Sequence, residues 1–195
     1  MSIFEKDLTI DEPSHLSQIF FGMGCFWGAE RKFWQLDGLY TTAVGYAGGH
    51  TKNPNYETVC NGDTGHAEVV KVIYDQEILS LKQLLKIFWE SHDPTQLNRQ
   101  GNDIGSQYRS IILSNNSKEI EPLKDSKKKF QIELDKLSYG SIKTEIVILD
   151  KFYLAEDYHQ KYLHKNPNGY CGLKGTGAYY PVSYTHLTLP TRIFV

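Results

Sequence analysis

Hydrophobic and polar residues alternate in several stretches of the chain, and this two-residue period predicts half-buried strands. The stretch 66–74 alternates most regularly, so that Glu68 shares a face with Val70 and Val72. The stretch 144–149 is rich in β-branched residues and is expected to form a buried strand. The other predicted strands lie at residues 19–21, 39–46 and 109–114.

Apolar residues recur at helical spacing in two further stretches. Ser80 is expected to cap a helix that ends before Pro94, and residues 123–137 carry a second apolar face. Residues 29–36 and 155–164 are also expected to be helical. Helices and strands interleave without the regular spacing of a barrel, so the pattern predicts an α+β fold with helices packed on a sheet.

The length of 195 residues fits one domain, because single hydrophobic cores are usual at this size. Residues 182–195 fit neither a strand nor a helix face, and they resemble a translated vector sequence. We therefore expect a single domain over residues 1–181, followed by a tail of doubtful origin.

The charge balance and the cysteine count exclude several classes of protein. A formal net charge of −2 provides no basic field for nucleic acid or anionic lipid. No segment has the roughly 20 apolar residues that cross a bilayer, and the N-terminus lacks the apolar core of a signal peptide, so we expect a cytoplasmic protein without a membrane partner. Three cysteines are too few for a disulfide framework and too widely spaced for a zinc knuckle, and no histidine pairing indicates a metal site.

Cys25 lies in the turn between a predicted strand and a predicted helix, within Gly24-Cys-Phe-Trp-Gly28. Unpaired backbone N–H groups and the positive end of a helix favour a thiolate there, which makes Cys25 a candidate nucleophile. A lone cysteine is more often a small buried hydrophobe. The flanking glycines allow close approach of the backbone to a ligand, and two adjacent large aromatic residues favour a site.

An ordered set of motifs extends from about residue 20 to residue 172. The motifs are Gly24-Cys-Phe-Trp-Gly28, Gly45-Tyr-Ala-Gly-Gly49, Tyr56-Glu-Thr-Val-Cys60, Gly62-Asp-Thr-Gly-His-Ala-Glu68, Gly101-Asn-Asp103, Gln107-Tyr-Arg109, His164-Lys-Asn-Pro167 and Gly169-Tyr-Cys-Gly172. This set closely resembles the peptide methionine sulfoxide reductase A family. We accordingly expect a ferredoxin-like (α/β plait) sheet core with long active-site loops, and the activity of a peptide-methionine (S)-S-oxide reductase.

The resemblance implies that the Cys25 thiolate attacks the sulfoxide sulfur, methionine leaves, and a sulfenic acid remains on Cys25. A sulfoxide oxygen leaves only when it is protonated, so an acid must lie beside it. Glu68 suits this task, because an apolar setting raises the pKa of a carboxyl group. The pattern alone leaves an ordinary solvated glutamate equally open, and the resemblance favours the acid.

Five further residues match substrate positions of the family. Tyr56 and Tyr108 match positions that hydrogen-bond the sulfoxide oxygen, although each could otherwise be simple core packing. Phe26 and Trp27 match the aromatic pocket around the S-methyl group, which accepts the S epimer and rejects the R epimer. Asp103 matches a polar residue of the same site and is expected to contact the substrate backbone.

Cys171 and Cys60 are the two candidates for resolving the sulfenic acid as a disulfide. Cys171 is favoured, because it lies in a glycine-flanked segment and matches a resolving position of the family. The resemblance implies that thioredoxin then reduces the disulfide, without a bound cofactor or metal. Some relatives carry a further C-terminal cysteine, and this chain has none after Cys171. Either the chain is a two-cysteine version or a relay cysteine has been lost with the true end.

The expected substrates are oxidised proteins, peptides and free methionine-S-sulfoxide, and nothing in the pattern requires more than a monomer. A thiol peroxidase would share a reactive and a resolving cysteine, but it would need neither the pocket of Phe26 and Trp27 nor a buried acid. A second, non-enzymatic alternative is a protein in which Cys25 senses oxidation.

Overall fold

A six-stranded sheet forms the centre of the computed structural model, which describes residues 4, 5, 13 and 15–181. Its strands follow the order β7-β6-β1-β3-β2-β8, and neighbours run antiparallel except for the parallel pair β6 and β7. The strands are β1 (Ser17–Met23), β2 (Leu39–Ala47), β3 (Ala67–Tyr74), β6 (Ser110–Ser114), β7 (Glu145–Ile148) and β8 (Phe152–Leu154). A separate hairpin pairs β4 (Arg99–Gln100) with β5 (Asp103–Ile104).

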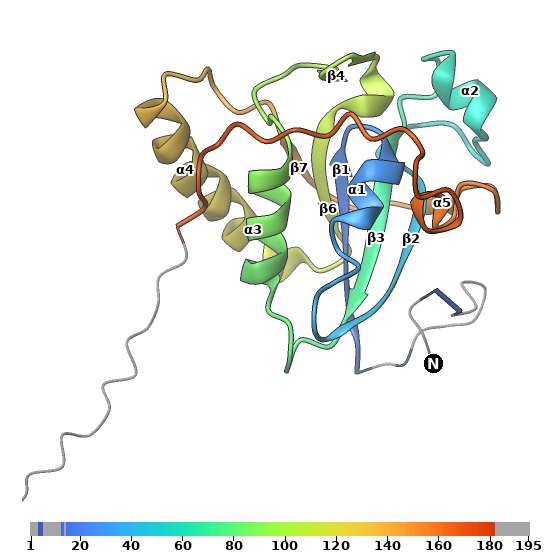
Figure 1. Cartoon of the computed structure of the whole chain (residues 1–195), viewed down its shortest axis with the longest axis horizontal. Helices are drawn as coiled ribbons and strands as arrows, with labels where there is room; N and C mark the ends of the chain where they lie inside the picture. Colours follow the sequence, from blue (N-terminus) through green and yellow to red (C-terminus); the bar gives the residue numbers. More distant parts are fainter. Residues whose placement is uncertain (1–3, 6–12, 14, 182–195) are drawn as a thin grey trace, which may run out of the picture.

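Three helices share one buried apolar cluster with a face of this sheet (Figure 1). They are α1 (Phe26–Arg31), α3 (Leu81–Ser91) and α4 (Ile120–Lys136). The shorter helices α2 (Tyr56–Cys60) and α5 (Tyr162–Lys165) lie on the side of the molecule away from α4 (Figure 1). The 3-10 turns are η1 (Ser106–Tyr108) and η2 (Ser117–Glu119). The fold is therefore mixed α+β, as the sequence predicts.

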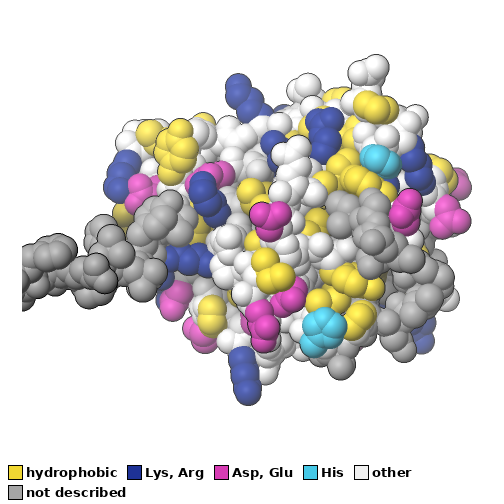
Figure 2. All heavy atoms as spheres, turned by 60° about the horizontal axis from the view of Figure 1, so that its bottom comes forward, with side chains coloured by type: hydrophobic (Ala, Val, Ile, Leu, Met, Phe, Trp, Pro, Cys, Tyr) yellow, Lys and Arg dark blue, Asp and Glu magenta, His cyan; other side chains and the backbone are white. Residues whose placement is uncertain are grey.

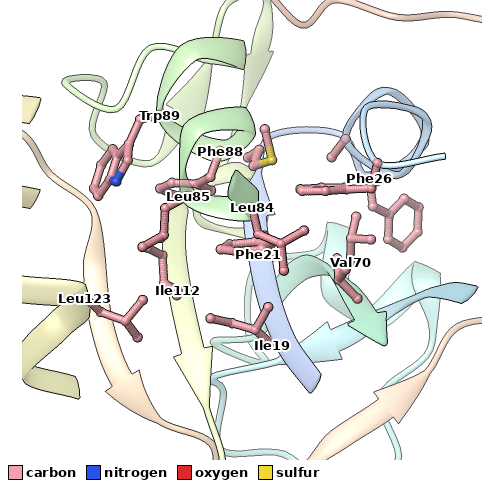
Figure 3. Packing of buried hydrophobic residues seen from close by; sticks show 14 of the residues in the cluster. Ile19, Phe21, Phe26, Val70, Leu84, Leu85, Phe88, Trp89, Ile112 and Leu123 are labelled. Carbon is pink, nitrogen blue, oxygen red and sulfur yellow. The ribbon is translucent and has the colours of Figure 1, made fainter. Parts of the chain in front are cut away.

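Aromatic side chains hold α3 against the sheet (Figure 3). The ring of Phe21 on β1 stacks with Phe33 at 5.4 Å and with Phe88 of α3 at 5.1 Å between ring centroids. Leu84 and Ile112 belong to the same cluster and are fully buried. Burying one such side chain contributes about 1.5 to 3 kcal/mol, so this face supplies a large part of the driving force for folding.

The alternation predicted for β3 is confirmed. Val70 and Val72 join the helix-covered cluster, whereas Ala67 and Val69 join a second buried cluster on the opposite face of the sheet. Glu68 falls on the helix-covered face, and its side chain is only 2% exposed. The strand period therefore places a carboxyl group inside an apolar layer.

The helix predicted over residues 155–164 is wrong for most of its length. Lys161 has a left-handed φ of 53°, and α5 begins only at Tyr162. The Lys161 ammonium group makes a buried ion pair with Glu30 of α1 at 3.1 Å. This long-range contact accompanies the irregular backbone, and local helical spacing contains no information about it.

Other boundaries differ for local reasons. The stretch 144–149 was expected to be buried, and this is wrong, because β7 is an edge strand whose residues are mostly exposed. The first helix begins at Phe26 and ends at Arg31, earlier at both ends than the predicted 29–36. Ser80 caps α3 as predicted, since its hydroxyl accepts a hydrogen bond from the N–H of Gln83 at 3.3 Å.

The described surface carries both signs of charge. On the face shown in Figure 2, acidic and basic side chains are interspersed rather than gathered by sign. A mixed surface of this kind creates no strong field for a polyanion. Within residues 15–181, no helix combines the length and the apolar character that spanning a bilayer requires.

The segment after α5 returns across the helix-covered face and ends beside α4 (Figure 1). Ala178 and Tyr180 are buried at its end. The N–H of Tyr180 donates to the Glu90 side chain of α3 at 2.8 Å, and its ring lies 6.4 Å from that of Phe130 on α4. The expected tail, residues 182–195, lies outside the described residues.

Truncation at two points tests where the domain ends. A chain that stops after Pro181 is expected to melt at the temperature of the intact chain, whereas one that stops after Gly177 loses the buried Tyr180. Loss of a large buried aromatic side chain costs about 3 to 5 kcal/mol, which lowers Tm by roughly 6 to 20 °C in a domain of this size. Thermal unfolding followed by circular dichroism measures both. An equal loss of stability after truncation at Pro181 would contradict the expected boundary.

Candidate active site

Cys25 occupies the turn that joins β1 to α1. It is the N-cap residue of α1, and its carbonyl oxygen accepts a hydrogen bond from the N–H of Ala29 at 3.3 Å. Gly24 before it has a φ of +97°, and a Cβ atom there would lie 2.7 Å from Cβ of Gln100. Only glycine fits such a conformation and space without strain, so this residue fixes the direction in which Cys25 leaves the sheet.

A pocket of about 150 Å³ opens at Cys25. Its walls are formed by Cys25, Phe26, Trp27, Tyr56, Glu68, Asp103, Tyr108 and Tyr170. Every predicted site residue except Cys171 therefore lines one cavity. Tyr170 was missed by sequence reasoning, although it directly precedes Cys171 in a motif that had been singled out.

Glu68 supplies a carboxyl group that holds its proton near neutrality. Burial raises its pKa from 4.5 to about 8, and the charge of Asp103 adds to this effect. The N–H of Phe26 donates to Glu68 Oε2 at 3.0 Å, which favours the ionised form but is outweighed by desolvation. Glu68 is therefore a protonated acid near neutral pH, and its side chain also links β3 to the start of α1 through this hydrogen bond.

The Cys25 thiol is also protonated in this surrounding. Burial raises its pKa to about 12, and the charge that Glu68 carries above about pH 8 acts in the same direction. The N–H groups of Trp27 and Gly28 lower the pKa, as expected for a helix start, but they are outweighed. The thiolate that the sequence suggests must therefore be generated during the reaction rather than stored beforehand.

Two tyrosines line the same cavity. Burial raises the pKa of both Tyr56 and Tyr108 above the ordinary phenol range, so each remains a hydrogen-bond donor. The backbone of Tyr56 is fixed by a hydrogen bond, in which its N–H donates to Glu156 Oε1 at 2.8 Å. Glu156 Oε2 also accepts from the hydroxyl of Tyr46, at 2.8 Å. Sequence reasoning did not identify Glu156.

The aromatic wall is fixed by residues that sequence reasoning also missed. Trp27 Nε1 donates to His159 Nδ1 at 3.0 Å, and the Trp27 ring stacks on Tyr162 at 3.9 Å between centroids. His159 is buried, which lowers its pKa and keeps Nδ1 available as an acceptor. Phe26 is only 1% exposed and also belongs to the helix-covered core (Figure 3). The pocket wall is therefore continuous with the core.

Cys171 lies outside the pocket lining but against the same helix. A Cβ atom on Gly28 would lie 2.8 Å from Cys171 Sγ. Cys60 occupies the end of α2, one turn after Tyr56, whose hydroxyl it contacts. All three cysteines are free thiols. The geometry thus brings both candidate resolving cysteines near the site.

Groups of three or more residues suited to metal binding are absent from the described part of the chain. A second cavity of about 390 Å³ is lined by His50, His66 and Lys151, among others. Both nitrogens of His66 bond to backbone groups, Nδ1 to the N–H of Gly49 and Nε2 to the carbonyl of Thr51. His66 therefore has a structural role.

Comparison with known proteins gives consistent matches. A family model described as Peptide methionine sulfoxide reductase matches residues 17–183. The Peptide methionine sulfoxide reductase MsrA of Maricaulis maris is 53% identical over 93% of this chain and 83% of that protein. The solved Methionine sulfoxide reductase A of Corynebacterium diphtheriae is similar with a TM-score of 0.79 and 42% identity, covering 82% of this chain and 79% of that chain. Mxr1 from Saccharomyces cerevisiae in complex with Trx2 has a TM-score of 0.56 and 25% identity, covering 80% of this chain and 91% of that chain.

The raised pKa of Glu68 predicts a pH-dependent gain of stability in Glu68→Gln. The unfolded chain ionises this carboxyl near 4.5 and the folded protein near 8, so its burial destabilises the fold increasingly as pH rises between these values. Above about pH 8 the penalty is roughly 3 to 5 kcal/mol, and Glu68→Gln should raise Tm by at least about 5 °C there but not near pH 5. Thermal melts at both pH values measure this. Glu121→Gln, at an exposed position of α4, is the matched control, and an equal gain for Glu68→Gln at both pH values would refute the buried acid.

Proposed function

The chain belongs to the peptide methionine sulfoxide reductase family, and we propose that it reduces methionine-S-sulfoxide with Cys25 as nucleophile, Glu68 as acid and Cys171 as resolving cysteine. The observation that carries this proposal is the pocket in which the Cys25 thiol and the buried acid Glu68 stand among aromatic side chains. Oxidised proteins, peptides and free methionine-S-sulfoxide are the proposed substrates, which makes the enzyme a repair oxidoreductase.

In the first step, Cys25 loses its proton to solvent and its sulfur attacks the sulfoxide sulfur. The proton of Glu68 moves to the sulfoxide oxygen, which would otherwise leave as a strongly basic anion. The bond between the substrate sulfur and its oxygen breaks, and the protonated oxygen bonds to the Cys25 sulfur as the transient bond between the two sulfurs breaks. This leaves a sulfenic acid on Cys25 and releases methionine. The substrate sulfur is reduced by two electrons and the Cys25 sulfur is oxidised by two. Glu68 then regains a proton from solvent, which its raised pKa favours at neutral pH.

Tyr56 and Tyr108 would donate hydrogen bonds to the oxygen as charge develops on it. The support for this role is that both tyrosines line the pocket and that their hydroxyls stay protonated. Phe26 and Trp27 would hold the S-methyl group against their rings, and this contact would select the S epimer. Asp103 would accept a hydrogen bond from the backbone of the substrate.

In the second step, the Cys171 thiol condenses with the sulfenic acid to give a disulfide and water. We infer that thioredoxin reduces this disulfide by thiol exchange, so that no bound cofactor is needed. The complex of yeast Mxr1 with Trx2 supports this choice of reductant. A reducing compartment such as the cytoplasm suits a cycle that starts from free thiols.

We also infer that the core has a ferredoxin-like topology. The central strands β6-β1-β3-β2 are antiparallel neighbours, with α1 between β1 and β2 and α3 between β3 and β6 along the chain. This order supports a ferredoxin-like plait for the core of one catalytic domain.

The proposal predicts a specific pattern of turnover on peptides that carry one epimer of methionine sulfoxide. Only the S epimer should be reduced, and Cys25→Ser should abolish reduction. Cys171→Ser should retain turnover with dithiothreitol and lose turnover with thioredoxin, because the small thiol can reduce the sulfenic acid directly. Cys60→Ser should retain both. Methionine formation measured by chromatography reads out each variant.

Other outcomes of this assay assign the chemistry elsewhere. Reduction of the R epimer would contradict the proposed pocket. Loss of thioredoxin-driven turnover in Cys60→Ser, with retention in Cys171→Ser, would give the resolving role to Cys60. Consumption of hydrogen peroxide without turnover of either sulfoxide would indicate a thiol peroxidase.

The two tyrosines are expected to act together on the first turnover. Tyr56→Phe and Tyr108→Phe should each slow methionine formation by roughly a hundredfold to a thousandfold, because each removes one donor to the developing oxyanion. The double variant should be slower than either. Tyr153→Phe, whose ring lies in the other cavity, is the matched control. Rapid-quench measurement isolates this step from recycling, and wild-type rates in both single variants would remove the tyrosines from the mechanism.

A further inference from the structure

The first turn of α1 contains a glycine, Gly28, and the Cys171 sulfur lies where a side chain of residue 28 would be. Gly28 is the third residue of α1 and is buried. A Cβ atom built there would lie 2.8 Å from Cys171 Sγ and 3.6 Å from Cβ of Leu173. The first separation is too short for a real contact in a close-packed protein, so Cys171 keeps this position only because residue 28 has no side chain.

Contacts on either side of Cys171 hold it at this place. The hydroxyl of Tyr170 donates to the Asp103 carboxylate, with 3.3 Å to each oxygen. Leu173 packs against the helix-covered core. Residues three apart lie on the same side of a helix, so Gly28 stands close to Cys25 along α1. Cys171 therefore lies against the first turn of the helix that Cys25 caps.

We propose that Gly28 is a positioning residue for the resolving step. The absence of a side chain at position 28 leaves the space that the Cys171 sulfur occupies before it attacks Cys25. This inference rests on the proposed function, in which Cys171 resolves the sulfenic acid. In the step, the Cys171 sulfur bonds to the Cys25 sulfur while the S–O bond breaks, and hydroxide leaves with the Cys171 proton as water. The Cys25 sulfur is reduced and the Cys171 sulfur is oxidised.

The substitution Gly28→Ala tests whether the space at residue 28 positions Cys171. Gly28 has no left-handed φ, so the backbone accepts alanine, and alanine is the better helix former. The new methyl group opposes the fold only through Cys171. Displacement of a reacting atom by about 1 Å can cost on the order of a hundredfold in rate, so even a small shift of Cys171 should be visible.

The test follows the fate of the sulfenic acid without external reductant. Enzyme is mixed with one equivalent of a methionine-S-sulfoxide peptide, and the Cys25 to Cys171 disulfide is quantified by mass spectrometry after rapid quenching. Gly28→Ala should slow disulfide formation by at least about tenfold and increase dimedone labelling of Cys25. The ratio of thioredoxin-driven to dithiothreitol-driven turnover should fall with it. Gly140→Ala is the matched control, because a Cβ atom there meets nothing within 4 Å.

Each result decides the question. Disulfide formation at the wild-type rate in Gly28→Ala overturns the proposal. The melting temperature should fall in Gly28→Ala but not when the same change is made in Cys171→Ala, and an equal loss in both backgrounds also overturns it. If thioredoxin-driven turnover survives Cys171→Ser in the otherwise unchanged protein, the resolving role itself fails, whatever Gly28→Ala does.

Discussion

Burial of the Glu68 carboxyl group at the start of α1 is the constraint on which the rest of the site depends. The strand period places Glu68 on the face of β3 that the helices cover, and the N–H of Phe26 closes over it at 3.0 Å. This hydrogen bond joins the sheet to the residue next to Cys25. Desolvation exceeds its effect, so the carboxyl stays protonated. Acid chemistry here is therefore a property of the packed core, since water admitted between α1 and the sheet would return the acid to its ordinary ionised form.

The irregular segment between β8 and α5 fixes the positions of two residues that line the pocket, through hydrogen bonds to them. Glu156 holds the backbone of Tyr56, and His159 holds the indole of Trp27. Gln160, the next residue along the chain, accepts a hydrogen bond from the N–H of Val44 on β2 at 2.9 Å and donates one to the Val44 carbonyl at 2.8 Å. A regular helix points consecutive residues in different directions around its axis. Those directions are fixed by the helix geometry. The irregular backbone of this segment does not have this restriction, so Glu156, His159 and Gln160 can each reach a partner on a different element.

Much of the fold follows from local signals in the sequence. The faces of β3, the Ser80 cap and the turn at Gly24 are set by residues close in the chain, and the ordered motifs point to most of the pocket. Glu156 and His159 could not be found in this way, because their partners are separated from them by 100 and 132 residues. Such contacts depend on how the sheet and helices are assembled in three dimensions.

The reaction imposes two opposed demands on the thiols. Reduction of the sulfoxide needs a dry, rigid site, and burial leaves the Cys25 thiol protonated and weakly reactive toward adventitious oxidants. Recycling needs contact with a second thiol and then with a large protein reductant. The proposed cycle separates these demands, because Cys25 caps a helix of the core whereas Cys171 lies in a segment of half-buried and exposed residues outside the sheet. In the proposed resolving step, the glycine at position 28 would let the two thiols meet, since it leaves room for the Cys171 sulfur against the helix.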